Sequence, residues 1–319
     1  MMQRLFNKLT LIAMALALCV VVLGAYVRLS NAGLGCPDWP GCYGHITVPH
    51  HQIAQQAFPD KPLEAPKAWK EMVHRYFAGT LAVLILAIFV TAWRGRGQLT
   101  TKPTLPSVLL LLVMFQAALG MWTVTLLLKP VIVSLHLLGG MATLGVLTWL
   151  VSKRLPAATD ISMRSWALLA LVILVCQIAL GGWTSSNYAA LVCPDFPMCQ
   201  GSWAPHTDFF HGFRLIRELG QNADGSQLSL EALTAIHIMH RLGALFTFLY
   251  LGWFGSKLLK ISGLAIWGRV LLGMLVVQIV LGISNVVLSL PLAVAVAHNA
   301  GAAILLMTLV VINSKLNQG

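Results

Sequence analysis

The sequence predicts an all-α integral membrane protein: eight transmembrane helices in two tandem, parallel-related four-helix bundles, with both termini in the cytoplasm. Only 10% of the 319 residues are charged, whereas a soluble domain averages about 25%. Mean hydropathy is +0.80, and apolar stretches long enough to span a bilayer recur eight times along the chain. The predicted spans cover residues 10–28, 69–93, 106–127, 130–151, 165–185, 231–254, 264–286 and 291–313.

The first predicted span follows Arg4 and Lys8, as the apolar core of a secretory signal peptide would. Its apolar run is long for such a peptide, and no small-residue cleavage site follows it. We therefore interpret residues 10–28 as a helix that stays in the protein.

Basic residues are concentrated in alternate connections between the spans, and this pattern predicts the orientation of the chain. The remaining short connections hold only Lys129 and, after the seventh span, no charge. Because positively charged loops stay in the cytoplasm, the two long loops, at about 29–68 and 186–230, are predicted to face outward. This topology accounts for the net charge of +11, so no nucleic-acid partner is expected.

Two near-identical cysteine-bracketed stretches lie in the outer loops, CPDWPGC at 36–42 and CPDFPMC at 193–199. Disulfides persist on the oxidising side of a membrane. The alternative is a metal site that recruits His45 and His206, but neither loop has the four-ligand spacing of a zinc site or the Cys-x-x-Cys-His of covalent haem attachment. The expected disulfides are Cys36–Cys42 and Cys193–Cys199.

The two halves of the chain repeat one another. The cysteine pairs are offset by 157 residues, and so are Gly24 and Gly181 in VVVLGAYV and QIALGGWT. QAALG in the third span is matched by QIVLG in the seventh. Duplication of a four-helix unit leaves such offsets, and both copies then have the same orientation in the membrane. We predict an N-terminal bundle at 1–155 and a C-terminal bundle at 156–319.

Four histidines fall at corresponding depths in the even-numbered spans: His74, His136, His240 and His298. Ionisable groups inside a membrane are costly and usually functional. A divalent metal would need further carboxylate or cysteine ligands, which the spans almost lack. Haem needs only two axial ligands from the protein, while an apolar bundle buries its faces. We therefore predict one bis-histidine haem site in each half.

Glycines and arginines accompany these histidines. Arg75 and Arg241 each follow a histidine directly and would pair with haem propionates. The alternative is that both side chains extend to the lipid headgroups. Small residues near the histidines would let a flat ring approach the backbone, although they also serve plain helix packing. These residues are Gly79, Gly139, Gly140, Gly243 and Gly301.

The halves differ three residues before the first histidine of each pair, where one has Glu71 and the other His237. Residues at i and i+3 share a helix face, so Glu71 is expected to point toward the pocket of His74. A carboxylate there would take up protons during oxidation of a haem substituent; the alternative is a first-turn acid favoured by the helix dipole. We predict a catalytic N-terminal half and an electron-carrying or structural C-terminal half, and leave the role of His237 open.

The chain resembles the haem A synthases over essentially its whole length. The motifs that carry the resemblance are RLSNAGLGCPDWPGCYG (28–44), EMVHR (71–75), SLHLLGG (134–140), IHIMHR (236–241) and AHNAG (297–301). The resemblance implies oxidation of the position-8 methyl group of haem O to formyl, which gives haem A for haem-copper terminal oxidases. It implies haem O between His74 and His136, with Glu71 beside it. It also implies haem b between His240 and His298.

The resemblance further implies an enzyme of the bacterial inner membrane that receives its substrate from a haem O synthase and supplies terminal oxidase assembly. Cys36 and Cys42 match the cysteine pair of the family, and their role stays open between loop brace and redox participant. Many relatives lack the second pair, so we expect a structural role for Cys193 and Cys199. The sequence predicts neither the electron acceptor nor whether the protein forms a homo-oligomer.

Three other functions fit parts of the pattern. A dihaem b-type electron carrier shares the histidine pairs but gives Glu71 no role. A haem transporter usually has broken helices near the midplane, and no such pair of helices stands out. A quinone-linked disulfide oxidoreductase would need low-pKa thiols in Cys-x-x-Cys spacing, which is absent here. Haem A synthesis accounts for the most features.

Overall fold

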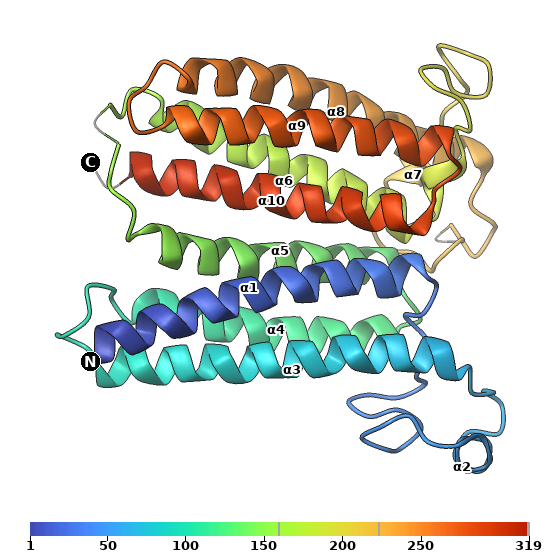
Figure 1. Cartoon of the computed structure of the whole chain (residues 1–319). Helices are drawn as coiled ribbons and strands as arrows, with labels where there is room; N and C mark the ends of the chain where they lie inside the picture. The colour runs from blue at the N-terminus through green and yellow to red at the C-terminus, as the bar shows by residue number, and fades with distance from the viewer. Residues whose placement is uncertain (159, 223, 318–319) are drawn as a thin grey trace. The chain divides into compact units, whose positions relative to one another are not determined.

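The computed structural model describes residues 1–158, 160–222 and 224–317. It divides into two compact units, Met1–Leu147 and Thr148–Gly319, and each is described by itself (Figure 1). In the described residues all regular elements are helices, accompanied by isolated bridges such as the one between Cys42 and His45. Eight of the helices are long and apolar enough to cross a bilayer. The chain is therefore an all-α, multi-pass membrane protein, as predicted.

The first unit is built from four long helices and one short helix in the first long loop. Their bounds are α1 Met2–Leu29, α2 His51–Ala57, α3 Ala65–Arg94, α4 Thr104–Thr125 and α5 Pro130–Ser152, whose last turn lies beyond the unit. Helix α3 packs against both α1 and α4. In the middle of α1 the buried residues are small, with Ala13 and Ala17 at most 1% exposed. Small side chains let membrane helices approach closely.

The second unit contains the other four long helices and two short ones. Their bounds are α6 Arg164–Ser186, η1 Ala189–Leu191, α7 Phe209–Gly212, α8 Leu230–Leu258, α9 Ala265–Val287 and α10 Leu292–Leu316. Helix α8 packs against α6 and α9, and α10 packs against the same two helices. Asn313 of α10 donates an amide hydrogen bond to the carbonyl of Ala167 on α6 at 2.9 Å. This bond links the ends of the two helices.

Several of the long helices extend beyond the predicted spans. Helix α1 begins at Met2, eight residues before the predicted start, because Phe6 and Thr10 are buried and continue the packing face toward the N-terminus. Helix α8 ends at Leu258, where Phe254 and Leu258 are fully buried. Hydropathy detects only the part of a helix that crosses the lipid, so the polar extensions were not predicted.

The connections of the two units share an uncommon backbone conformation. The described residues contain eight non-glycine residues with positive φ, and they form four pairs, two offset by 157 residues and two by 162: Asn31 with Tyr188, Tyr43 with Gln200, Leu127 with Ser289, and Leu128 with Leu290. A left-handed conformation costs an L-residue about 1–2 kcal/mol, so it is found where the surrounding turn requires it. The loops of the two units therefore turn in the same way at matched positions.

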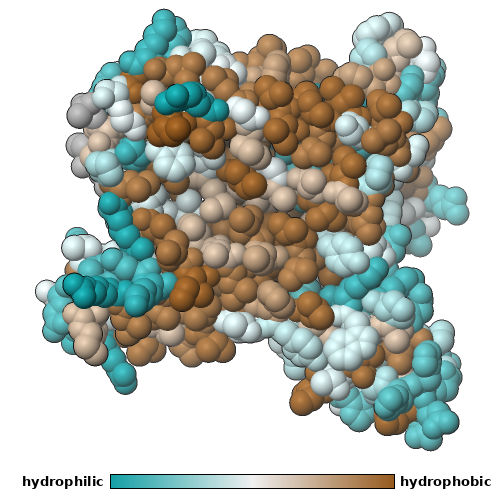
Figure 2. Space-filling view, in the orientation of Figure 1, coloured by the Kyte–Doolittle hydropathy of each residue, from teal (hydrophilic) through white to brown (hydrophobic). Residues whose placement is uncertain are grey.

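Apolar side chains cover the sides of the helices, and hydrophilic side chains gather at their ends and over the loops (Figure 2). Large exposed residues include Val83, Leu111 and Leu168, at 67%, 66% and 58% exposure. Such exposure would be unfavourable in water, but it suits helices whose sides face lipid.

Candidate functional site

The four predicted histidines form two pairs, one in each unit. His74 on α3 lies close enough to His136 on α5 to interact with it electrostatically. His240 on α8 has the same relation to His298 on α10. The Nδ1 atoms of His74, His136 and His298 are buried and make no hydrogen bond among the described residues. These imidazoles therefore retain ring nitrogens without a hydrogen-bond partner, buried among the apolar helices.

Each histidine ring rests on a glycine of a preceding long helix. A Cβ atom built on that glycine would lie 3.0–3.4 Å from the Cε1 atom of the ring: 3.0 Å for Gly24 and His74, 3.4 Å for Gly120 and His136, 3.2 Å for Gly181 and His240, and 3.1 Å for Gly282 and His298. Each glycine thus provides what we call a seat for the ring, a space that the side chain of a larger residue would occupy. The four histidine rings therefore occupy the same type of position, next to a glycine of another helix.

This arrangement fits haem better than a bare divalent ion. In the described part of the chain no cluster of three or more His, Cys, Asp or Glu side chains comes together, whereas a protein-bound metal ion usually has at least three such ligands. Haem requires one ligand on each side of the ring plane. Paired imidazoles with buried free nitrogens in apolar helices supply that donor set, so the residues present fit the predicted group.

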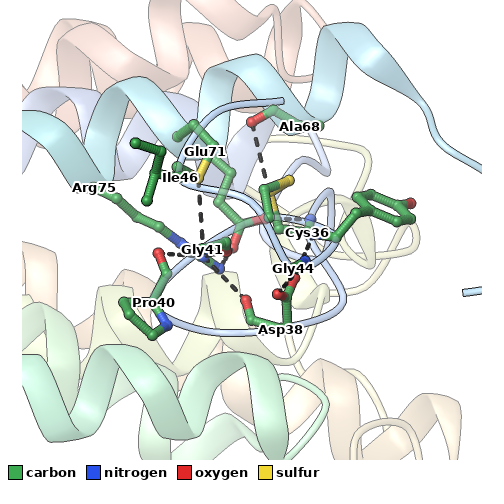
Figure 3. Close-up of a disulfide and its surroundings, with 12 residues drawn as sticks. Cys36, Asp38, Pro40, Gly41, Gly44, Ile46, Ala68, Glu71 and Arg75 are labelled. Atoms are coloured by element: carbon green, nitrogen blue, oxygen red, sulfur yellow. Dashed lines mark hydrogen bonds and ion pairs between the residues drawn. A yellow bond between two sulfur atoms is a disulfide. The ribbon is translucent and has the colours of Figure 1, made fainter. Parts of the chain in front are cut away.

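Glu71, three residues before His74 on α3, is bound to the long loop between α1 and α3 (Figure 3). Its side chain is 5% exposed. The backbone N–H of Cys36 donates to its Oε2 at 3.0 Å, and Arg75 pairs with its Oε1 at 2.6 Å. Because α3 begins at Ala65, Glu71 is not in the first turn. The alternative interpretation as a first-turn acid is therefore wrong.

Arg75 fastens the same loop to α3. Its Nη1 donates to the carbonyl oxygens of Asp38 at 3.0 Å and Pro40 at 3.2 Å, and also to that of Gly41 (Figure 3). With Glu71 on its Nη2, both terminal nitrogens of the guanidinium bind protein atoms. The contact with a haem propionate stays a prediction, and the side chain does not extend alone toward the headgroups.

The second unit repeats this anchor with a different partner. Arg241 donates to the carbonyl oxygens of Met198, Cys193 and Asp195 at 2.8, 3.0 and 2.9 Å. Its Nε lies 3.2 Å from Nε2 of His237. His237 therefore takes the place that Glu71 has beside Arg75, and the second unit has no carboxylate there.

Both predicted disulfides are present, Cys36–Cys42 and Cys193–Cys199, with Cα–Cα distances of 4.8 and 4.5 Å. The cysteine thiolates are therefore not available to the alternative metal site with His45 and His206. Each disulfide closes one copy of the duplicated Cys-Pro-Asp-aromatic-Pro motif, which contains a cis peptide bond before its second proline.

The aspartate of the motif holds the turn that follows the second cysteine, a role that sequence reasoning missed. Asp38 accepts from the backbone N–H groups of Tyr43 at 2.6 Å and Gly44 at 2.8 Å. Asp195 accepts from Gln200 at 2.7 Å and Gly201 at 2.9 Å. The N–H groups of Gly201 and Gln200 hold the pKa of the Asp195 carboxyl below its usual range. The motif was duplicated in sequence because it builds the same turn twice.

Sequence reasoning also missed three glutamines in the spans, of which one is buried and two are half-buried. The predicted small residues Gly139, Gly243 and Gly301 face their amides, so each of these glycines makes room for a glutamine. The residues are Gln116, Gln177 and Gln278. The recurring spacing QAALG, QIALG and QIVLG was a visible signal, because a glutamine recurs four positions before three of the four seat glycines.

Comparison with known proteins identifies the family. The COX15-CtaA family model, described as cytochrome oxidase assembly protein, matches residues 7–310. The chain belongs to this family. A heme A synthase of Shewanella oneidensis is 46% identical over 312 residues, which cover 95% of this chain and 94% of that protein.

More distant family members align over most of their length. A heme A synthase of Allorhizobium ampelinum is 28% identical, with 95% of this chain and 87% of that protein covered. One of a Caulobacter species is 27% identical, with 92% and 90% covered. The COX15-CtaA assignment therefore includes both units and both histidine pairs.

Proposed function

We propose that this COX15-CtaA protein is a haem A synthase, which oxidises the position-8 methyl group of haem O to formyl. The single observation that carries the proposal is the buried carboxylate of Glu71, three residues from His74, in a unit that also presents His136. The second unit has the same histidine pair but His237 in place of the acid. An electron carrier with two equivalent haems would not need this difference.

In this proposal, His74 and His136 hold haem O, the substrate, and His240 and His298 hold haem b, the resident cofactor. Haem supplies the iron and the conjugated ring at which electrons are stored and passed on. The apolar helices exclude water from the ring faces. Glu71 accepts protons released when the methyl group is oxidised, since a buried carboxylate within reach of the reacting group is suited to that role. Arg75 keeps the carboxylate of Glu71 in place.

The proposed architecture follows from the repeated features of the two units. We infer two tandem four-helix bundles, 1–155 and 156–319, related by an axis along the membrane normal. The paired positive-φ residues and the duplicated aspartate turn support this relation. The distribution of basic residues supports cytoplasmic termini and outer loops on the periplasmic side of a bacterial inner membrane, where disulfides are stable.

The proposed partners follow from the reaction. A haem O synthase supplies the substrate, and assembly of a terminal oxidase consumes haem A. The electrons leave through an acceptor that this site does not identify.

Pigment analysis of the purified protein tests the proposal. Pyridine haemochrome spectra and mass spectrometry of the extract are expected to detect haem b together with haem O or haem A. His240→Ala and His298→Ala should lose haem b, whereas His74→Ala and His136→Ala should stop formation of haem A first while haem b remains. A colourless protein from haem-rich cells, or haem A formation that survives loss of the first pair, would contradict it.

A further inference from the structure

Three of the four seats contain a glutamine that contacts the histidine or the glycine beside it. Gln177 of α6 donates from Nε2 to the carbonyl oxygen of His240 at 3.1 Å and lies 3.1 Å from Nδ1 of the same residue. Gln278 of α9 donates from Nε2 to the carbonyl oxygen of His298 at 3.0 Å and lies 3.4 Å from Nε2 of the same residue. In both cases one amide spans the backbone and the ring of one histidine.

In each of these two cases a glycine three residues after the histidine makes room for the amide. A Cβ atom on Gly243 would lie 2.4 Å from Oε1 of Gln177, and one on Gly301 would lie 2.2 Å from Oε1 of Gln278. Real Cβ atoms do not come this close to another heavy atom. The glutamine and the glycine therefore require one another, and together they fix where the amide lies.

Gln116 has the same register in the first unit. It precedes Gly120 by four residues, as Gln278 precedes Gly282, and its amide fills the space of a Cβ on Gly139, at 1.7 Å. Its Nε2 atom is buried and makes no hydrogen bond among the described residues. This polar group has a fixed place beside His136 and an unused donor.

His74 has the seat but lacks the glutamine. Gly24 lies under its ring, yet the residue four positions before Gly24 is Val20, and the residue three after His74 is Phe77. Valine can neither donate nor accept a hydrogen bond, and phenylalanine leaves no space for an amide. Three of the four histidines thus have a complete Gln–Gly clamp in sequence, and His74 does not.

We propose that Gln116, Gln177 and Gln278 are positioning residues that fix the imidazole planes of three axial histidines, and that unclamped His74 is the ligand that releases when the substrate haem exchanges. This inference rests on the proposed function. A ligand held in its bound orientation loses less freedom on binding and binds more tightly. Haem b remains in place and has two clamped histidines, whereas haem O must enter and haem A must leave with every turnover.

The clamp is tested first at the haem b site. Gln177→Met and Gln278→Met keep nearly the same side-chain volume and remove the amide. We expect haem b to stay bound, but the electron paramagnetic resonance spectrum of its ferric low-spin form and its midpoint potential to shift, since both depend on the orientation of the axial imidazoles. Gln116→Met is the matched control, because it should leave the haem b spectrum unchanged. An unchanged spectrum and potential in the first two variants would overturn the proposal.

The second test adds a clamp instead of removing one, so it does not depend on tolerance of a lost contact. Val20→Gln with Phe77→Gly introduces the missing pair beside His74, and Val20→Leu with Phe77→Gly is the control that opens the same space without an amide. Transfer of haem from the first unit to excess apomyoglobin should slow about two- to tenfold relative to the control, as expected for one added hydrogen bond. Equal transfer rates would overturn the assignment of His74 as the releasing ligand.

These outcomes separate the inference from the proposed function. Variants that carry haem and form haem A, with the spectrum and transfer rate of the unmodified protein, would overturn the clamp and leave haem A synthesis intact. An unmodified protein that binds no haem would overturn both.

Discussion

The backbone N–H of Cys36 donates a hydrogen bond to the carboxylate of Glu71 at 3.0 Å. A residue in a disulfide-closed loop thus directly holds the acid that lies three residues from His74. Arg75 closes the arrangement by binding Glu71 and three carbonyl oxygens of the same loop. The position of the proposed proton acceptor therefore depends on the fold of the loop, and the two roles must be separated experimentally.

Glu71→Gln separates them. The glutamine oxygen can still accept from Cys36, but the side chain no longer takes up a proton. We expect haem A formation to fall by about 100-fold or more, the usual effect of losing a general base, while haem b content is unchanged. The product is measured by chromatography of extracted haems.

Glu231→Gln is the matched control for that substitution, because Glu231 is an exposed acid in the first turn of α8. It should retain full haem A formation. Undiminished haem A in Glu71→Gln would instead favour a dihaem electron carrier or a purely structural role for the acid.

The two disulfides are expected to differ in their effect on the reaction. Removing either disulfide should lower the free energy of unfolding by roughly 2–3 kcal/mol, because each closes a short loop. In Cys36→Ser with Cys42→Ser, the freed loop releases its bond to Glu71, so haem A formation should fall about tenfold, the effect of losing one hydrogen bond to a charged group. Extracted haems again provide the measurement.

The paired variant Cys193→Ser with Cys199→Ser frees a loop that contacts Arg241, beside which His237 stands in place of a glutamate. It should lower the thermal stability of the protein to a similar extent and keep haem A formation. An equal loss of product in both double variants would show that the disulfides act only through overall stability.

The sequence was sufficient for the membrane spans, the disulfides and the paired histidines, because each depends on a local pattern. Twenty apolar residues, a Cys-x₅-Cys loop in two copies and a histidine at a matched depth are visible without coordinates. The i, i+3 relation of Glu71 and His74 also follows from helix geometry.

The contacts of Glu71 with Cys36, and of Gln177 with His240, were not predicted. The first joins an irregular loop to a helix 35 residues later, and no periodicity encodes where such a loop lies. The second joins residues 63 apart on two helices, and it depends on their relative rotation, which hydropathy does not determine. A glutamine in a leucine-rich span is an informative polar residue only when its helical partner is known.

Acidification should destabilise the turn that Asp195 holds in the second long loop. The folded-state pKa of this carboxyl is lowered, chiefly by the N–H of Gly201, so its stabilising effect is complete above the unfolded value of about 3.9 and is lost as pH falls through the folded value. Hydrogen exchange at Gln200 and Gly201, corrected for the intrinsic rate, should therefore accelerate below about pH 4.

Asp195→Asn keeps an acceptor oxygen but does not titrate, so its exchange should be faster than that of the unmodified protein at neutral pH and independent of acidification. Parallel pH profiles for the two proteins would show that the carboxylate does not hold the turn.

The glycine seats predict a sharp difference between two substitutions in α9. A Cβ at Gly282 would lie 3.1 Å from Cε1 of His298, whereas a Cβ at Gly273 would meet nothing within 4 Å. Gly282→Ala should force the imidazole away from its rotamer at a cost of about 0.5–1.5 kcal/mol, which weakens haem b binding about two- to tenfold. Gly273→Ala should bind haem b normally and raise stability slightly, because alanine favours a helix over glycine. Haem b is titrated into each apoprotein and followed by its absorption band. Equal affinities would mean that the close approach of ring and backbone has no part in holding the cofactor.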